Sequence, residues 1–229
     1  VCALSGRLGK DASAWNLVPQ LPFELAILPH QIFRWLRLSV VSYAIPALIA
    51  VGLARHENTG SGISVRRLLR NFVKGRTLEI LAAMQPQSGG FLEATPLTAF
   101  VALGLAGAGY SEHRVVKRCV EFLIASARAD GSWPIDTNLT TWVTTQAINQ
   151  FLPKSNPLSR AQSDGLRQWL LGQQHTAEHP FTHAAPGGWA WTDLSGGVPD
   201  ADDTAGALLA LLRLGPVDQP TRRAAVSGL

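Results

Sequence analysis

Apolar residues recur at helical spacing along most of the chain, and two kinds of helical segment alternate. One kind is apolar on a single face, with apolar residues at i, i+1, i+4, i+7 and i+8, as in Val115, Val116, Cys119, Phe122 and Leu123. The other kind is apolar on nearly all sides, as in 97–109, 141–152 and 204–215. Half-exposed helices alternating with enclosed ones predict an all-α protein in which outer helices surround inner helices, an α/α toroid or helical barrel. A flat helical solenoid would share this alternation and stays an alternative.

Three stretches of the chain resemble one another and predict a structural repeat. Each contains a bulky residue followed by leucine, and each ends in a glycine turn that closes with an aromatic residue. The leucines and the closing aromatics are Leu81 with Phe91, Leu123 with Trp133, and Leu170 with Trp189. Glutamine follows the leucine by four positions in two repeats, as Gln85 and Gln174, and Ala127 takes that place in the other.

These repeat residues have a structural explanation that needs no catalysis. Glycine permits a tight turn with positive φ, and an indole packs over the preceding helix while its N–H finds an acceptor. Glutamine reaches the polar groups left at helix ends and ties neighbouring repeats together. We therefore expect Gln85, Phe91, Trp133, Gln174 and Trp189 to stabilise the fold.

Composition narrows the class of protein. Of the 229 residues 46% are hydrophobic and 16% charged, against about 25% charged in an ordinary soluble domain, which excludes intrinsic disorder. Two cysteines, Cys2 and Cys119, build no disulfide framework, so a reducing compartment is expected. The net charge is +4. The densest basic cluster has helical spacing with Leu68, Leu69, Phe72 and Val73 interleaved, which predicts a solvated basic face over an apolar core and no nucleic-acid partner. Its members are Arg66, Arg67, Arg70, Lys74 and Arg76.

The segment 38–54 carries no charge and lies between Arg37 and Arg55. Its length is at the short limit of the roughly 17 to 25 residues that span a bilayer, and Pro46 in its middle is expected to interrupt a helix. A helix buried within an α-protein is the favoured interpretation. Contact with one face of a membrane and a true span are the alternatives.

The repeats resemble the QW motifs of the squalene-hopene cyclase family, the class II triterpene cyclases. Three further stretches support this: 21–35 is similar to the LPxE…LP segment of the family, 131–145 resembles a stretch of its bacterial members, and 199–205 (PDADDTA) resembles its DxDDTA signature. The resemblance extends from about Asn16 onward. The chain departs from the family pattern at Phe91, at Ala127 and at Val40 with Val41.

The resemblance implies polycyclisation of squalene or a related linear polyprene, started by protonation and needing no metal or other cofactor. The DxDD motif, in place of DCTA, favours a polyene over an epoxide. The family implies membrane contact at the cytoplasmic side and is compatible with a homodimer.

We expect 1–185 to be a toroid domain and 186–229 to open a second barrel with the acid motif. The chain is then a piece of a longer polypeptide and inactive alone. The alternative is a non-catalytic toroid that binds isoprenoids or a protein partner.

The aspartate cluster also suits this chemistry on physical grounds. Three carboxyl groups within four residues do not all ionise in a dry cavity, so one proton is retained near neutral pH. The following helix offers its positive end to the carboxylates that remain. The resemblance makes Asp202 the proton donor, tuned by Asp200 and Asp203. A simple N-cap is the structural alternative.

Aromatic side chains are needed to stabilise a carbocation, and Trp142 and Trp191 are the candidates, with core packing as the alternative. A rival cluster consists of His175, His179 and His183 at i, i+4 and i+8, the spacing of metal ligands on one helix. Pro180 interrupts that helix, and the stretch has the composition of an exposed loop. We therefore expect no metal site there.

Overall fold

The computed structural model describes residues 1–9, 11–36, 42–59, 64–152, 157–180 and 182–228. Throughout these residues the chain forms helices and turns and no strand, which confirms the all-α prediction. The closed toroid remains a prediction. The chain divides into two compact units, Val1–Ile135 and Asp136–Leu229, called unit 1 and unit 2 below. The expected domain limits, 1–185 and 186–229, also remain a prediction.

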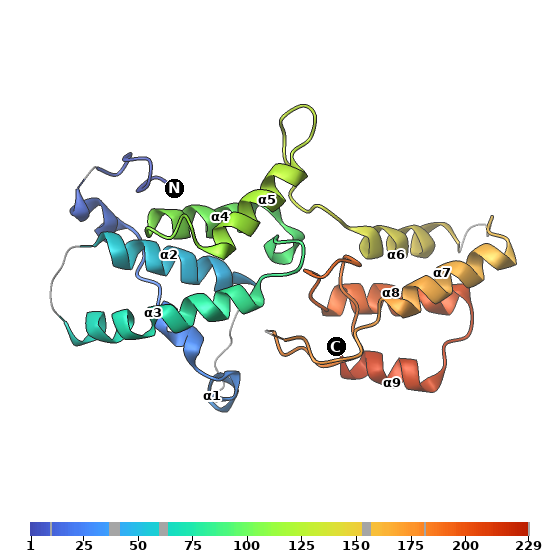
Figure 1. The fold of residues 1–229 in the computed structure, drawn as a ribbon. Helices are drawn as coiled ribbons and strands as arrows, with labels where there is room; N and C mark the ends of the chain where they lie inside the picture. Colours follow the sequence, from blue (N-terminus) through green and yellow to red (C-terminus); the bar gives the residue numbers. More distant parts are fainter. Residues whose placement is uncertain (10, 37–41, 60–63, 153–156, 181, 229) are drawn as a thin grey trace. The chain divides into compact units, whose positions relative to one another are not determined.

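Unit 1 begins with short helical turns and continues with longer helices (Figure 1). In chain order its elements are η1 (Ala12–Leu17), η2 (Phe23–Ile27), α1 (His30–Trp35), η3 (Ser42–Ala44), α2 (Ile45–Asn58), α3 (Val65–Met84), η4 (Phe91–Glu93), α4 (Thr95–Gly107) and α5 (Arg114–Ser126). The core lies where α2 packs on α4, which also packs on α5. A Cβ atom on Gly104 would lie 2.9 Å from the backbone of Ala50, so glycine is what lets α2 and α4 approach so closely.

Helix α2 covers most of the uncharged segment 38–54, of which 38–41 lies outside the described residues. Pro46 stands in its first turn, where a missing N–H breaks no hydrogen bond, so the expected interruption is wrong. Ile49 and Leu53 of this helix are almost completely buried, which supports the buried-helix interpretation, although Leu48 is 39% exposed. Among the described residues, no helix is both long enough and apolar enough to cross a membrane.

In the first half of α3 the basic and apolar residues do not lie on the faces that the sequence predicts. Arg70 is buried, because its guanidinium bonds to Glu24 at 2.9 Å and lies 5.1 Å from the ring centre of Phe23. Leu68 and Phe72 are instead 61% and 87% exposed. The core face of α3 is formed further along the helix, mainly by Val73, Leu78 and Leu81. The expected basic face over an apolar core is therefore wrong for the first half of α3.

Unit 2 contains α6 (Thr140–Phe151), α7 (Arg160–Gly172), α8 (Ala201–Leu214) and α9 (Gln219–Ser227) (Figure 1). Helix α8 packs against the other three. The core of unit 2 comprises Ile148, Leu170, Trp189, Ala207, Ala210, Leu211, Val217 and Ala225. Helix α7 contributes Leu170 to this core and leaves most of its surface exposed. The predicted enclosure of 204–215 is wrong for α8, which buries one face and leaves Leu209 and Leu212 51% and 49% exposed.

The two repeat glutamines make equivalent hydrogen bonds. Gln85 Nε2 donates to the carbonyl oxygens of Gly89 at 2.9 Å and Val115 at 3.1 Å. Gln174 Nε2 donates to those of Gly187 at 2.9 Å and Thr221 at 3.5 Å. In each case one amide group joins the glycine turn of its own repeat to the first turn of a later helix, α5 or α9.

The two repeat tryptophans also make equivalent bonds. Trp133 Nε1 donates to the carbonyl oxygen of Leu123, and Trp189 Nε1 to that of Leu170, both at 2.7 Å. These leucines are the ones that align in the sequence repeats. In the remaining repeat Phe91, which has no N–H to donate, is 2% exposed. The indole therefore closes the helix end that precedes it, while the phenyl ring supplies packing alone.

Candidate functional site

The glycine turn of the third repeat holds the acid motif in place at the start of α8. The backbone N–H of Asp200 donates to the carbonyl of Trp189 at 3.1 Å. The N–H of Trp189 in turn donates to Thr204 Oγ1 at 3.0 Å. A Cβ atom on Gly188 would lie 3.0 Å from that same hydroxyl, so the turn and the helix are in close contact. Because Trp189 is fully buried, this arrangement fixes the first turn of α8 to the core of unit 2.

Asp200 is the N-cap of α8. Its Oδ1 accepts the backbone N–H of Asp203 at 2.8 Å, and its backbone is extended, as expected for a residue that precedes a helix. The structural alternative considered for the motif thus describes Asp200 well. A cap requires one carboxylate and leaves the other two aspartates to be explained.

Asp203 is the buried carboxyl group of the motif, with 5% of its surface exposed. Burial above all, together with the charge of Asp200, a hydrogen bond with the Asp200 side chain and the charge of Asp202, raises the pKa of Asp203 to about 7. Its Oδ1 atom is buried and has no hydrogen-bond partner among the described residues. A protonated carboxylic acid is therefore present near neutral pH, as the sequence argument for the cluster requires.

Asp202, the donor implied by the family resemblance, is exposed at the start of α8. The raised pKa belongs to its neighbour Asp203, and the donor role of Asp202 stays a prediction. A sequence signal distinguishes the two: Asp203, Thr204, Ala207, Ala210 and Leu211 occupy i, i+1, i+4, i+7 and i+8, the buried stripe of α8. Asp202 lies off this stripe.

The two candidate tryptophans adjoin each other at the start of α6. The backbone N–H of Trp142 donates to the carbonyl of Trp191 at 3.0 Å. Trp191 Nε1 is buried with no hydrogen-bond partner among the described residues, whereas Trp142 is 45% exposed. Helix α6 is joined to α8 through Asn149, whose Nδ2 donates to the carbonyl of Gly206 at 2.9 Å. Both indoles therefore lie in unit 2, the unit that carries the acid motif, while Gln85, Phe91 and Trp133 lie in unit 1.

Thr141 is a buried polar residue of unit 2 that sequence reasoning missed. It is fully buried, and its Oγ1 has no hydrogen-bond partner among the described residues. Thr141 and Thr145 are both buried at i and i+4, so a period-based search for inward polar residues on α6 would have found the pair. A buried polar atom without a partner is costly and marks a place where function or a bound molecule explains it.

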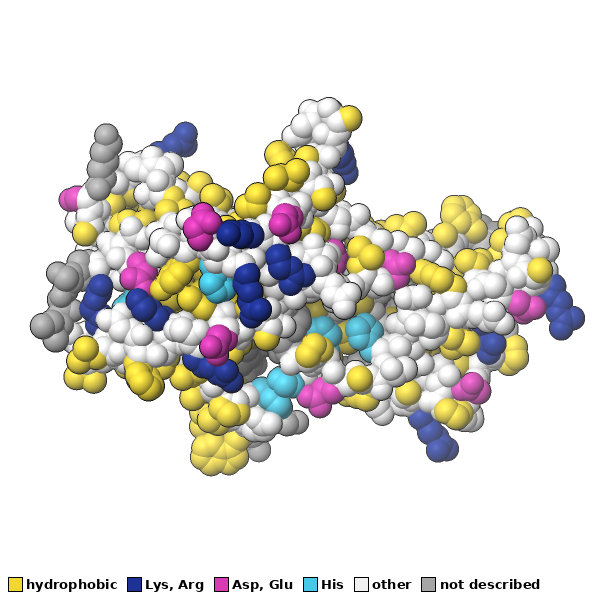
Figure 2. All heavy atoms as spheres, in the orientation of Figure 1, with side chains coloured by type: hydrophobic (Ala, Val, Ile, Leu, Met, Phe, Trp, Pro, Cys, Tyr) yellow, Lys and Arg dark blue, Asp and Glu magenta, His cyan; other side chains and the backbone are white. Residues whose placement is uncertain are grey.

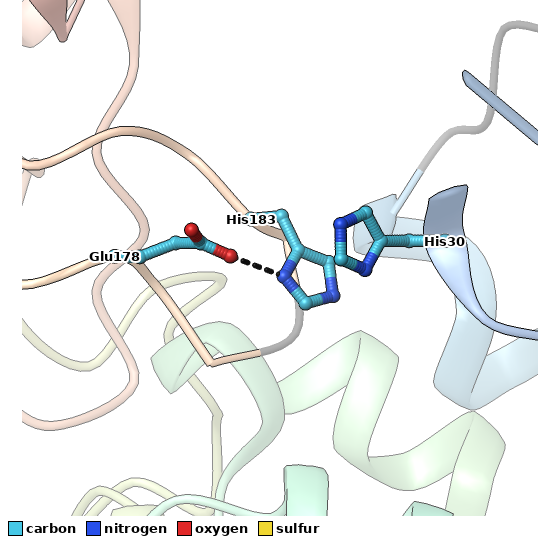
Figure 3. Close-up of side chains that lie close together, drawn as sticks. All are labelled: His30, Glu178 and His183. Carbon is cyan, nitrogen blue, oxygen red and sulfur yellow. Dashed lines mark hydrogen bonds and ion pairs between the residues drawn. The ribbon is translucent and has the colours of Figure 1, made fainter. Parts of the chain in front are cut away.

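The three histidines lie in the turns after α7 and share no helix. His179 is buried, and burial is the main cause that lowers its pKa to about 4. The expectation of an exposed loop is therefore wrong at His179, whose Nδ1 lies 2.9 Å from the hydroxyl of Thr182. His183 Nδ1 lies 2.6 Å from Glu178 Oε1 (Figure 3). His30, drawn in the same view, belongs to unit 1.

No protein-family model matches the chain, and no curated protein sequence matches it. The resemblance to squalene-hopene cyclases therefore rests on the motifs, and the function below is argued from them together with the geometry of unit 2.

Proposed function

We propose that the protein is a class II terpene cyclase of the squalene-hopene type, an intramolecular transferase that converts squalene or a related linear polyprene into a cyclic triterpene. The observation that carries this proposal is the buried Asp203, a carboxyl group that a pKa of about 7 leaves protonated to a large extent near neutral pH, within a DxDD motif at the N-terminus of α8. An N-cap alone explains only Asp200.

The proposed reaction moves one proton and needs no cofactor. The acid O–H bond breaks, a C–H bond forms at the terminal alkene, and the π electrons leave a tertiary carbocation that successive double bonds attack. Loss of a proton at the end makes the overall change an isomerisation. The raised pKa of Asp203 retains a proton within the motif, and the N-terminus of α8 stabilises the carboxylate left after transfer. Trp191 and Trp142 are the proposed aromatic groups for the cation.

The roles within the motif follow from the environment of each carboxyl group. Asp200 and Asp203 form the pair that retains a proton, because one of them is buried and the two share a hydrogen bond. Asp202 is the donor that the resemblance implies. Its exposure means that proton transfer to a water-insoluble polyene requires the substrate to cover it.

Membrane contact is part of the proposal, because such a substrate resides in a bilayer. Four apolar residues at i, i+3, i+4 and i+7 form an exposed stripe on α3. They are Val65, Leu68, Leu69 and Phe72, with exposures of 85%, 61%, 53% and 87%. Apolar and basic side chains lie side by side over this helix (Figure 2). An apolar face bordered by basic residues suits a membrane surface, here the cytoplasmic one.

The test uses the protein expressed from its complete reading frame, incubated with squalene in detergent and analysed by gas chromatography with mass spectrometry. We expect cyclic triterpene from the unaltered protein and a loss of at least about 100-fold in both Asp202→Asn and Asp203→Asn. Asp193→Asn is the matched control, an exposed aspartate in the turn before the motif. Absence of cyclic product from the unaltered protein overturns the function, and full turnover by Asp202→Asn overturns its donor role.

A further inference from the structure

Unit 1 contains a pocket of about 240 Å³ whose lining is unusually rich in arginine. It is formed where the end of α2 meets the start of α3. Arg55, Arg66, Arg67 and Arg70 line it, and none of its described lining residues is acidic. The proposed cyclase reaction uses none of these residues.

The pocket carries an excess of positive charge. Glu24 is close to two of its arginines, at 3.5 Å from Arg66 and 2.9 Å from Arg70. Arg55 has no side-chain hydrogen bond or ion pair with another described residue, and it is half-buried. Four guanidinium groups in one pocket repel each other, and a bound anion would relieve that repulsion.

Neutral oxygen atoms hold three of the guanidinium groups in position. Arg67 Nη1 donates to the carbonyl of Thr59 at 3.1 Å, Arg66 Nη1 to Gln20 Oε1 at 3.3 Å, and Arg70 Nη2 to the carbonyl of Leu21 at 3.2 Å. Positioned side chains lose little freedom when a ligand binds, so less of the binding energy is spent on ordering them.

The start of α3 adds a favourable field. Ser64, the N-cap of this 20-residue helix, lines the pocket. The N-terminus of a helix carries partial positive charge and attracts anions. Arginine forks match the oxygen geometry of phosphate groups and bind two oxygens at once. The volume is below the roughly 300 to 1,000 Å³ of sites for drug-sized molecules, which favours a small anion or a head group.

We propose that this pocket binds a phosphate-type anion, of the size of phosphate or diphosphate. The exposed stripe of α3 begins at Val65, next to Ser64, so the phosphate of an anionic lipid and a free anion are both sterically reasonable sources of the same chemistry. The pocket is independent of the acid motif, and its test does not depend on cyclase activity.

The experiment measures binding to the 229-residue chain in two arms. Isothermal titration calorimetry with sodium pyrophosphate tests a free anion, and co-sedimentation with phosphatidylcholine vesicles, with and without phosphatidic acid, tests a lipid-borne one. Arg55→Gln is the test variant. Arg76→Gln is the matched control, because Arg76 is an exposed arginine of α3 that pairs with Glu79 outside the pocket. Circular dichroism checks that each variant keeps its helices.

We expect Arg55→Gln to weaken binding by about tenfold or more, the effect of one charge-assisted hydrogen bond, and Arg76→Gln to change it less than about twofold. Pyrophosphate binding that Arg55→Gln weakens supports a free anion. Binding only to vesicles with phosphatidic acid, weakened by the same change, supports a lipid phosphate. No binding in either arm, or binding that Arg55→Gln leaves unchanged, overturns the proposal.

Discussion

Asp202 and Asp203 are neighbours in the sequence and have opposite environments at the start of α8. Asp202 is exposed, whereas Asp203 lies on the buried stripe beside Thr204. A carboxylate that leaves water without a cationic partner loses solvation, so the proton stays on Asp203 up to a pH near 7. One step of about 100° around a helix thus separates an exposed carboxyl group from a buried one that holds its proton.

The raised pKa of Asp203 makes the stability of unit 2 depend on pH. Between its ordinary pKa of 3.8 and about 7, the folded state keeps a proton that the unfolded state has released. Unfolding then releases a proton, so the free energy of unfolding falls as pH rises through this window. Asp203→Asn removes the titrating group and should remove this fall.

We compare the free energy of unfolding of Asp203→Asn with that of the unaltered chain. This difference should be more favourable to Asp203→Asn by roughly 1 to 2 kcal/mol at pH 8 than at pH 4.5. This is less than the full shift implies, because water reaches the exposed Asp202 beside it. Urea denaturation at the two pH values measures the difference, with Asp193→Asn as the control. An equal effect of Asp203→Asn at both pH values would contradict the assigned proton.

At the scale of elements, the same hydrogen bond occurs in two different environments. The indoles of Trp133 and Trp189 each donate to the carbonyl of the aligned leucine at the end of the preceding helix, at 2.7 Å. Trp133 is 52% exposed and Trp189 is fully buried. Water replaces a lost donor at an exposed site, whereas no water reaches a buried carbonyl to replace one.

We therefore expect Trp189→Phe to lower the free energy of unfolding by about 2 to 3 kcal/mol, from the lost indole hydrogen bond to the Leu170 carbonyl, which keeps only the Gln173 N–H, and from the cavity left by the smaller ring. Trp133→Phe should cost less than about 1 kcal/mol. Urea denaturation followed by circular dichroism compares the two. A loss at Trp133 as large as the loss at Trp189 would show that the repeat bond is not governed by burial.

At the scale of the whole molecule, local patterns could be read from the sequence and long-range partners could not. Apolar periodicity predicts the helices, and the glycine turns predict the bonds of Gln85 and Gln174, because those partners are local or repeated. The burial of Arg70 depends on Glu24, 46 residues earlier, and on the ring of Phe23. No periodicity encodes that pairing, so the face of α3 that turns inward was predicted wrongly. The apolar spacing of α8 includes Asp203 and could have predicted its burial. The family resemblance instead implies Asp202 as the important residue.

Each compact unit has a core of its own. In unit 1 the core lies between α2 and α4, with Leu53 and Leu105 fully buried, and in unit 2 it surrounds α8 and Trp189. A region with its own core unfolds cooperatively as a unit. We therefore expect two transitions in differential scanning calorimetry of the 229-residue chain.

A change in one core should move only one of these transitions. Trp189→Phe should lower the melting temperature of unit 2 by about 10 °C, since about 1 kcal/mol shifts a unit of this size by roughly 4 to 8 °C. Leu105→Ala should instead lower the other transition, because it opens a cavity in the core of unit 1. Because the two substitutions lie in separate cores, their effects on the two melting temperatures should add without coupling in the double variant. A single transition that both changes shift together would show that the chain folds as one cooperative body.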